Sequence, residues 1–447
     1  MVGTARMDDL GNAMSGASNT ALDHYQRALG ELQRYIGDPL ATVDRALEDS
    51  PGFVMGHALR AWLHLLGTEP AGLPVARASY EAARRLPATS QERGHLDAIG
   101  CLLEGEWHAA GRVLEDVAIE HPRDALALQA GHLIDFYTGA SRMLRDRIAR
   151  ALPCWSEGMP GYHALLGMHA FGLEETGHYA RAEAVGRRAV EIEPCDGWAQ
   201  HAVAHVMEMQ GRQRDGIAWM RTNAEAWSRD SFFAVHNWWH LALYHLDLGE
   251  EEEVLRLYDG PIYGKCSQVV LDMVDASALL WRLHLRGMEL SDRWQPVADA
   301  WEPIAAAGSY AFNDVHAMMA FVGTGRREAA QTVLEAQRRA MEGAGDNAVF
   351  TREVGAPVTR AILAFGEGNY GETVRLLRPV RDIAHRFGGS HAQRDLLDLT
   401  LAEAALRDGQ ATLAAALAAE RADLKPSSPS GPAFLKRATE LRARAAA

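Results

Sequence analysis

The chain has 447 residues, of which 48% are apolar, a composition that is ordinary for a globular protein. Its net charge is −14 with acidic and basic residues interspersed, which argues against a nucleic-acid partner because such partners favour a basic face. No run of 18 apolar residues occurs, so we expect no membrane span.

The compartment is predicted from the N-terminus and from the cysteines. The first residues contain no apolar segment of the kind found in a secretory signal. The four cysteines lie far apart in the sequence, which does not suggest a disulfide framework or a zinc knuckle. We therefore expect a cytoplasmic protein, and the sequence leaves its oligomeric state open.

A helical repeat runs along most of the chain. Apolar residues recur at i, i+3 and i+4, and short glycine-containing turns separate these segments. The spacing from Gly177 to Gly211 is 34 residues, and Pro194 follows Gly177 by 17 residues. This period and punctuation are typical of tetratricopeptide repeats. We predict an all-α right-handed superhelix of antiparallel helix pairs, without a sheet of three or more strands.

The predicted organisation is one helical array with atypical ends. Residues 1–18 are expected to be disordered, 19–432 to form a single tetratricopeptide-like α-solenoid, and 433–447 to form a closing helix. The repeat pattern is strong at 90–260 and 360–430 and degenerate at 20–90 and 261–350. Solenoids need atypical terminal units because these carry a solvent-facing side. Gly211 and Gly249 are expected at helix ends with positive φ.

Two histidine pairs with i, i+4 spacing stand out, each pair on one face of a predicted helix. With Gly211 at repeat position 15, His201, His205 and Glu208 occupy positions 5, 9 and 12. With Gly249 at position 15, His236 and His240 occupy positions 2 and 6. Inward-facing positions of the first helix line the concave groove of such a repeat, so we expect these five residues to surround one cavity. They are the candidate catalytic residues, and the four histidines are the candidate metal ligands.

Other polar and aromatic residues are candidates for binding a ligand in this groove. Trp239 either walls the pocket or packs between helices. Asp275 equally fits a solvated helix face, and Asp395 fits a helix N-cap. The candidate ligand-binding residues are Asn237, Trp239, Tyr244, Asp275, Asn313, Asp314, His316 and Arg394.

Three stretches together resemble the tetratricopeptide repeat protein 38 family. They are His-Ala-Val-Ala-His-Val-Met-Glu-Met from His201, Ala-Val-His-Asn-Trp-Trp-His-Leu-Ala-Leu-Tyr from Ala234, and Gly-Ser-His-Ala-Gln-Arg-Asp from Gly389. The resemblance runs from about residue 30 to 440 and implies a soluble helical-repeat fold. The family motif covers His201, His205, Glu208, His236, Asn237, His240, Asn313, Asp314, His316, Gln393, Arg394 and Asp395. The resemblance implies no particular reaction.

Four interpretations of the histidine cluster remain open. The preferred one is a polar pocket lined by His, Glu, Asn and Trp that binds a small molecule or short peptide. The alternative is an enzyme that uses the histidines for acid–base chemistry. No nucleophile elbow, phosphate loop or dinucleotide motif is present. The sequence requires no cofactor, but the paired histidines suit a divalent metal. A purely structural polar core is the fourth interpretation.

Overall fold

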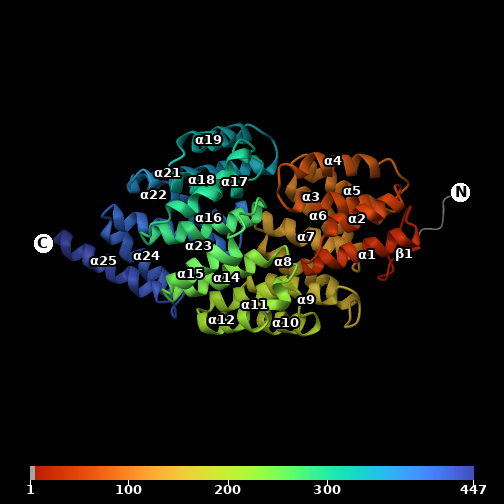
Figure 1. Cartoon of the computed structure of the whole chain (residues 1–447), viewed down its shortest axis with the longest axis horizontal. Helices are drawn as coiled ribbons and strands as arrows, with labels where there is room; N and C mark the ends of the chain where they lie inside the picture. Colours follow the sequence, from red (N-terminus) through yellow and green to blue (C-terminus); the bar gives the residue numbers. More distant parts are fainter. Residues whose placement is uncertain (1–5, 447) are drawn as a thin grey trace. The chain divides into compact units, whose positions relative to one another are not determined.

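The computed structural model describes residues 6–446, and most of them lie in helices (Figure 1). Within this range the only sheet is a hairpin of two short strands. The all-α prediction is therefore confirmed for the described residues. Two compact units divide the chain: one contains residues up to Val203 together with Asn223–Ala234, and the other contains Ala204–Thr222 and the chain from Val235 onward.

The first unit contains the hairpin and a series of helices that pack against their neighbours in sequence. Its elements are β1 Arg6–Met7, β2 Ala13–Met14, α1 Asn19–Arg34, α2 Pro39–Asp49, α3 Val54–Leu66, α4 Gly72–Ala83, α5 Ser90–Leu103, α6 Trp107–Glu120, α7 Ala125–Tyr137, α8 Ser141–Ala151, the 3₁₀ helix η1 Leu152–Cys154, α9 Tyr162–Glu174, α10 Tyr179–Ile192 and α13 Ala224–Ser228. Helix α11, Gly197–Met209, passes from this unit into the second after Val203.

The second unit is built in the same way but contains more irregular turns. Its elements are α12 Gln213–Thr222, α14 Ala234–Asp247, α15 Glu251–Leu257, the π-helical turn η2 Tyr258–Ile262, α16 Val270–Leu285, α17 Ser291–Trp301, the 3₁₀ turn η3 Glu302–Ile304, α18 Ala311–Thr324, α19 Arg327–Met341, α20 Asp346–Phe350, the π-helical turn η4 Thr351–Gly355, α21 Ala356–Gly366, α22 Tyr370–Leu377, the 3₁₀ segment η5 Arg378–Phe387, α23 His391–Arg407, α24 Ala411–Leu424 and α25 Ser430–Ala446.

Consecutive helices pack against each other within each unit, as in α5 with α6, α9 with α10, and α21 with α22. Small side chains allow this approach, and Ala170, Ala182 and Ala189 are fully buried. Capping residues begin several helices. Thr89 accepts the Glu92 backbone N–H, while the Glu92 carboxylate accepts the Thr89 backbone N–H, which forms a complete capping box at the start of α5.

The N-terminal segment differs from the sequence-based expectation. Residues 1–18 were predicted to be disordered, but residues 6–18 contain the β1–β2 hairpin and its connection to α1, while residues 1–5 lie outside the described range. Met14 is buried, and the Ser15 backbone N–H donates to Glu92 Oε1 at 2.7 Å. The Asn12 side-chain amide donates to the Arg123 carbonyl oxygen at 3.2 Å. These contacts to distant helices order a segment that has no repeat pattern of its own.

Two further boundaries can be compared with the prediction. The closing helix α25 begins at Ser430 rather than at residue 433. At its start the Ser428 hydroxyl accepts the Ser430 backbone N–H at 3.2 Å. The single solenoid predicted over 19–432 depends on how the two units follow each other, and it stays a prediction.

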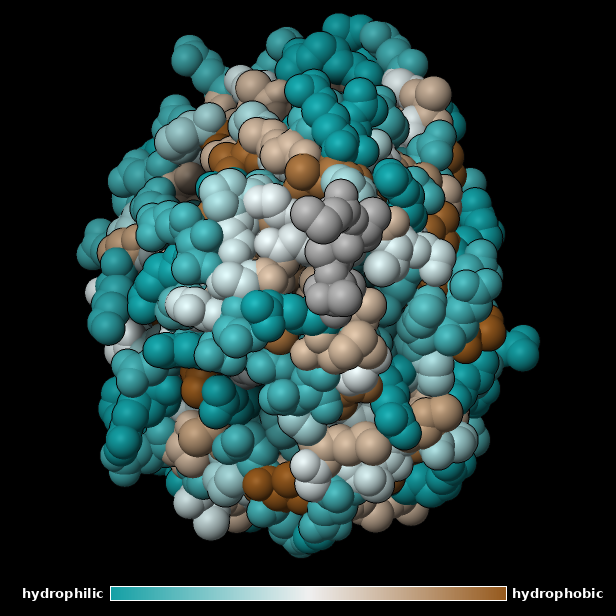
Figure 2. All heavy atoms as spheres, turned by 90° about the vertical axis from the view of Figure 1, so that its right-hand side faces the viewer, coloured by the Kyte–Doolittle hydropathy of each residue, from teal (hydrophilic) through white to brown (hydrophobic). Residues whose placement is uncertain are grey.

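The surface carries polar residues over most of the face at the N-terminal end, with apolar residues scattered among them (Figure 2). In the first unit the exposed apolar side chains include Met7 and Leu73, which are far apart in the sequence. Among the described residues, none of the helices combines the length and apolar character needed to cross a bilayer.

The turn glycines were predicted correctly: φ is +66° at Gly211 and +74° at Gly249. A Cβ at Gly249 would meet no heavy atom within 4 Å, so a substitution there tests backbone conformation alone. We expect Gly249→Val to lower the free energy of unfolding by about 1 kcal/mol or more, because a β-branched residue is strained at positive φ. Urea unfolding measures this change.

The matched control is Gly52→Val, since Gly52 also faces open space but does not have positive φ. Equal destabilisation by the two substitutions would show that the conformation at Gly249 is not the cause.

Candidate functional site

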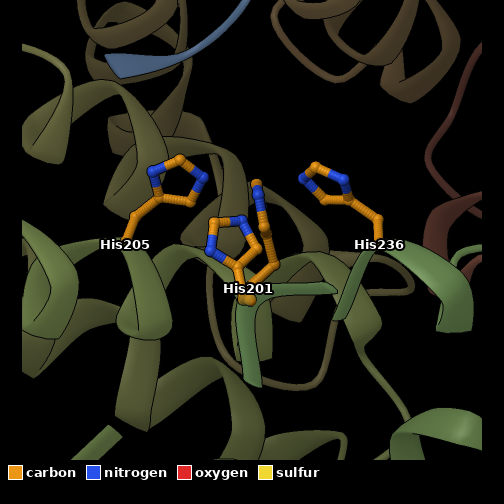
Figure 3. Close-up of side chains that lie close together, drawn as sticks. His201, His205 and His236 are labelled. Carbon is orange, nitrogen blue, oxygen red and sulfur yellow. The ribbon is translucent and has the colours of Figure 1, made fainter. Parts of the chain in front are cut away.

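Three histidine rings come together in the second unit, one from α11 and two from α14. The ring centroid of His205 lies 4.4 Å from that of His240, and His240 lies 4.9 Å from His236. Each ring offers one nitrogen, and these nitrogens lie within 4.8 Å of one another. Figure 3 shows His205 and His236 pointing toward each other from their two helices. We call His205, His236 and His240 the histidine centre.

Carboxylates orient two of these rings. His236 Nδ1 lies 2.8 Å from Asp275 Oδ2, and Asp275 is on α16. His240 Nδ1 lies 3.2 Å from Glu208 Oε2, and Glu208 is on α11, one turn after His205. With Nδ1–H donating to a carboxylate, each imidazole is held as the tautomer whose Nε2 carries the lone pair. Asp275 is buried, so its alternative role on a solvated helix face was wrong.

Burial favours the neutral form of His205 and His240. Desolvation lowers the pKa of His205 well below its usual value, and the nearby His240 ring lowers it further. Desolvation also lowers the pKa of His240, with added repulsion from His236, Arg282 and Lys425. Neutral imidazole is the form that accepts a proton or binds a metal.

A layer of aromatic and cationic groups lies beside the centre. The Trp239 indole stacks on His236 with centroids 5.3 Å apart and an interplanar angle of 14°. The Arg282 guanidinium lies 5.3 Å from the Trp239 ring centroid. Lys425 Nζ is 3.5 Å from Glu208 Oε1, so Glu208 connects an imidazole to an ammonium group.

A cavity of about 770 Å³ adjoins this layer, and all its lining residues belong to the second unit. Glu208, Tyr244, Arg282 and Lys425 line it, whereas Trp239 does not. Trp239 is fully buried and packs against His236, which places it among the helix contacts rather than in the cavity wall.

His201 belongs to the first unit. It lies one turn before His205 on α11, in the part of that helix assigned to the first unit. There its ring lies among the aromatic rings of Phe171, Trp198 and Phe233, with centroids 5.0–5.4 Å away.

The other predicted ligand-binding residues lie at several places. Asn237 is fully buried in α14, and the Tyr244 hydroxyl donates to the Ala204 carbonyl oxygen at 2.6 Å. His316 Nδ1 lies 2.8 Å from the Phe312 carbonyl oxygen of its own helix, α18. The Arg394 guanidinium donates to the Gly389 carbonyl oxygen. The predicted residues that belong to α18 are Asn313, Asp314 and His316, and all three are buried.

Asp395 was predicted as an N-cap, and that interpretation was wrong. Ser390 caps α23, and its capping box uses Gln393. Asp395 instead accepts two hydrogen bonds from the Arg421 guanidinium, at 2.7 and 3.1 Å. Arg282, Arg421 and Lys425 were missed as site residues. A lone arginine in an apolar helical segment, such as Arg282 in α16, was the available signal.

No family model matches the chain.

The buried carboxyl of Asp314 in α18 should make the stability of the protein depend on pH. Burial raises the pKa of its carboxyl to about 7, against 3.8 for the exposed group. The unfolded chain therefore releases this proton at lower pH than the folded protein, and stability falls as pH rises from about 4 to 7. Asp314→Asn removes the ionisable group. We expect the variant to be more stable than the wild type at pH 8, by on the order of 2–4 kcal/mol, and to show little gain at pH 4.

Urea unfolding at both pH values measures the difference. Asp423→Asn is the control, because Asp423 is exposed and its substitution should show no such pH dependence. A loss of stability in Asp314→Asn that is the same at both pH values would contradict the role of desolvation.

Proposed function

We propose that the protein binds one divalent metal ion, best matched by Zn²⁺, through His205, His236 and His240. The observation that carries this proposal is the pairing of two clustered imidazoles with carboxylates through Nδ1. Histidines that ligate metals almost always donate their other ring nitrogen to such a partner. The metal in this proposal binds the Nε2 atoms of His236 and His240 and one ring nitrogen of His205.

The choice of metal follows from the donor set. Neutral imidazoles suit zinc, copper and iron, and three protein ligands are the number found in catalytic zinc sites. Such sites keep a fourth position for water or substrate, and the metal lowers the pKa of the bound water. We propose that the open position serves a hydrolytic reaction or the activation of a small substrate. His201 on α11 was predicted as a fourth ligand, and a fourth protein ligand would favour a closed structural site instead.

A purely structural polar core is the competing explanation. It would bury His205, His240 and Asp275 at one place, with His236 and Glu208 partly buried beside them, at a desolvation cost that apolar side chains would avoid. A bound cation offsets that desolvation cost. It binds the lone pairs of the imidazole nitrogens directly, and it attracts the carboxylates through the imidazoles that they orient. This argument favours the metal over the structural role.

The type of helical repeat, the handedness of the superhelix and the cellular compartment are also proposals. We infer that the helix pairs are tetratricopeptide-like repeats of a right-handed superhelix, similar to the tetratricopeptide repeat protein 38 family, and that the protein acts in the cytoplasm. The 34-residue spacing and the positive φ of the turn glycines support the repeat. A small molecule remains the proposed partner, in preference to a peptide, because the second unit contains a cavity of about 770 Å³ lined by both charged and apolar side chains.

Metal binding is tested on protein treated with a chelator and then titrated with Zn²⁺. We expect one equivalent to bind per chain and the melting temperature to rise; at 100 times the Kd the stabilisation is about 2.7 kcal/mol. His240→Ala and His205→Gln should each weaken Zn²⁺ binding by more than about 100-fold, since loss of a ligand exceeds the roughly tenfold to 100-fold effect of an outer-shell change. Elemental analysis and calorimetry measure both quantities.

His284→Gln is the matched control, because His284 is a mostly buried histidine of the same unit that stacks on Trp281. It should bind Zn²⁺ like the wild type. If the wild type takes up no Zn²⁺, Co²⁺ or Cu²⁺, or if all three variants bind the metal equally, the proposal fails.

The role of the carboxylates gives a separate prediction. Asp275→Asn keeps the shape of the side chain but removes the charge that holds His236, so Zn²⁺ affinity should fall about tenfold to 100-fold. Asp272→Asn is the control, because Asp272 lies one turn before Asp275 on α16. It should change the Zn²⁺ affinity less than threefold. Identical affinities for the two variants would exclude an orienting role for Asp275.

A further inference from the structure

We propose that the cavity of the second unit binds a small organic carboxylate, with the carboxylate group on Arg282 and Lys425 and an apolar body against leucine side chains. This inference goes beyond the metal site, and it concerns a binding function that does not require the metal. Three features carry it: the charges in the cavity wall, the partners of Arg282, and the apolar remainder of the lining.

The cavity wall contains more cations than carboxylates. Its cations are Arg282, Arg286, Arg407, Arg421, Lys425 and Arg437. Its carboxylates are Glu208, Asp247, Glu251, Asp395 and Glu403. The lining therefore has an excess of one positive charge, which a single carboxylate group neutralises. A dianion would leave an uncompensated negative charge in the same space.

Most of these cations already contact carboxylates. Arg421 forms its two bonds to Asp395, and Glu403 accepts from Arg437 at 2.7 and 3.0 Å and from Arg407 at 2.7 Å. Arg286 Nη1 lies 3.4 Å from Glu251. These groups form the charged frame of the cavity and have little capacity for a further anion.

Arg282 differs from them. Its side chain is buried, and its guanidinium donates to the carbonyl oxygens of Ala392, at 2.6 Å, and Ala278, at 3.2 Å. Both acceptors are neutral, and within residues 6–446 Arg282 forms no ion pair within 4.0 Å. The carboxylates of Asp395, Glu208 and Asp275 act on it only from farther away. A buried cation without an adjacent counter-ion is costly, and an anion in the cavity supplies one.

Lys425 completes the anchor. Its ammonium group is 3.5 Å from Glu208, a long contact, and like Arg282 it lines the cavity. Arg282 lies over the Trp239 ring that stacks on His236, and Lys425 contacts the Glu208 carboxylate that contacts His240, so both cations lie close to the histidine centre. An anion held between them is therefore next to that centre rather than at the outer rim. Planar guanidinium groups suit carboxylates because they offer parallel N–H donors.

The apolar part of the lining selects the body of the ligand. Leu243, Leu285, Leu399 and Phe434 contribute side chains to the wall. A cavity of about 770 Å³ accepts a ligand larger than an inorganic ion. The combination of one unneutralised guanidinium and these side chains fits a medium-chain or aromatic carboxylic acid.

The test is calorimetric titration of chelator-treated protein with octanoate, and with octanamide as the uncharged analogue. We expect octanoate to bind and octanamide to bind at least tenfold more weakly. Arg282→Met should weaken octanoate binding tenfold to 100-fold, the range for loss of a charge-assisted hydrogen bond. Arg282→Lys keeps the charge and should retain part of the affinity, which guards against a variant that merely misfolds.

Arg293→Met is the control, because Arg293 belongs to the same unit and is bound to Asp259 but does not line the cavity. It should change octanoate affinity less than threefold. Equal binding of octanoate and octanamide, or octanoate binding to Arg282→Met at wild-type strength, overturns the proposal. Binding of inorganic phosphate in place of octanoate overturns the assignment to a carboxylate. Zn²⁺ titration of Arg282→Met separates the two sites, since loss of the anion site should leave the metal stoichiometry at one.

Discussion

The position of the histidine centre depends on how Tyr244 joins α14 to α11. Its hydroxyl donates to the Ala204 carbonyl oxygen, next to His205, while Tyr244 itself lies one turn after His240. Its ring occupies the space over Gly216 of α12, where an added Cβ would lie 2.3 Å from the ring. The side chain thus fixes both the distance and the register between the helices. A small shift of α14 along α11 would move His240 away from both His205 and Glu208.

Charge alternates through the second unit from the histidine centre to the cavity. Glu208 contacts His240 on one side and Lys425 on the other. Asp395 contacts Arg421 and also attracts the more distant Arg282 electrostatically. Asp395 keeps its charge there because Arg421, Lys425 and Arg282 hold its carboxyl pKa well below the usual value despite burial. Glu208 and Asp395 thus each have a cation in direct contact, whereas Arg282 has carboxylates only farther away. The elements that supply these charges are distant in the sequence.

This distance explains which features could be predicted. The period of apolar residues and the turn glycines depend on local conformation, so helices and turns at Gly211 and Gly249 were predictable. The i, i+4 spacing likewise placed His236 and His240 on one face. Asp395 was not predictable in the same way, because an aspartate near a helix start looks like a cap until Arg421 is known to face it. For Arg282 the sequence shows only that an arginine stands in an apolar helical segment. Its neighbours Trp239 and Ala392 come from other helices, so its contacts could not be predicted.

The N-terminal hairpin has a consequence for the order of folding during synthesis. Two of the contacts of this segment are to the Glu92 carboxylate in the first turn of α5 and to the carbonyl oxygen of Arg123 just before α7. Both belong to chain that the ribosome produces much later than the hairpin itself. These two contacts therefore form only after α5 and Arg123 have been made, whereas the bond from the Asp9 backbone N–H to Gln26 Oε1 in α1 can form earlier. In a chain whose consecutive helices pack against each other, this segment also depends on residues that follow it by 77 and 111 positions.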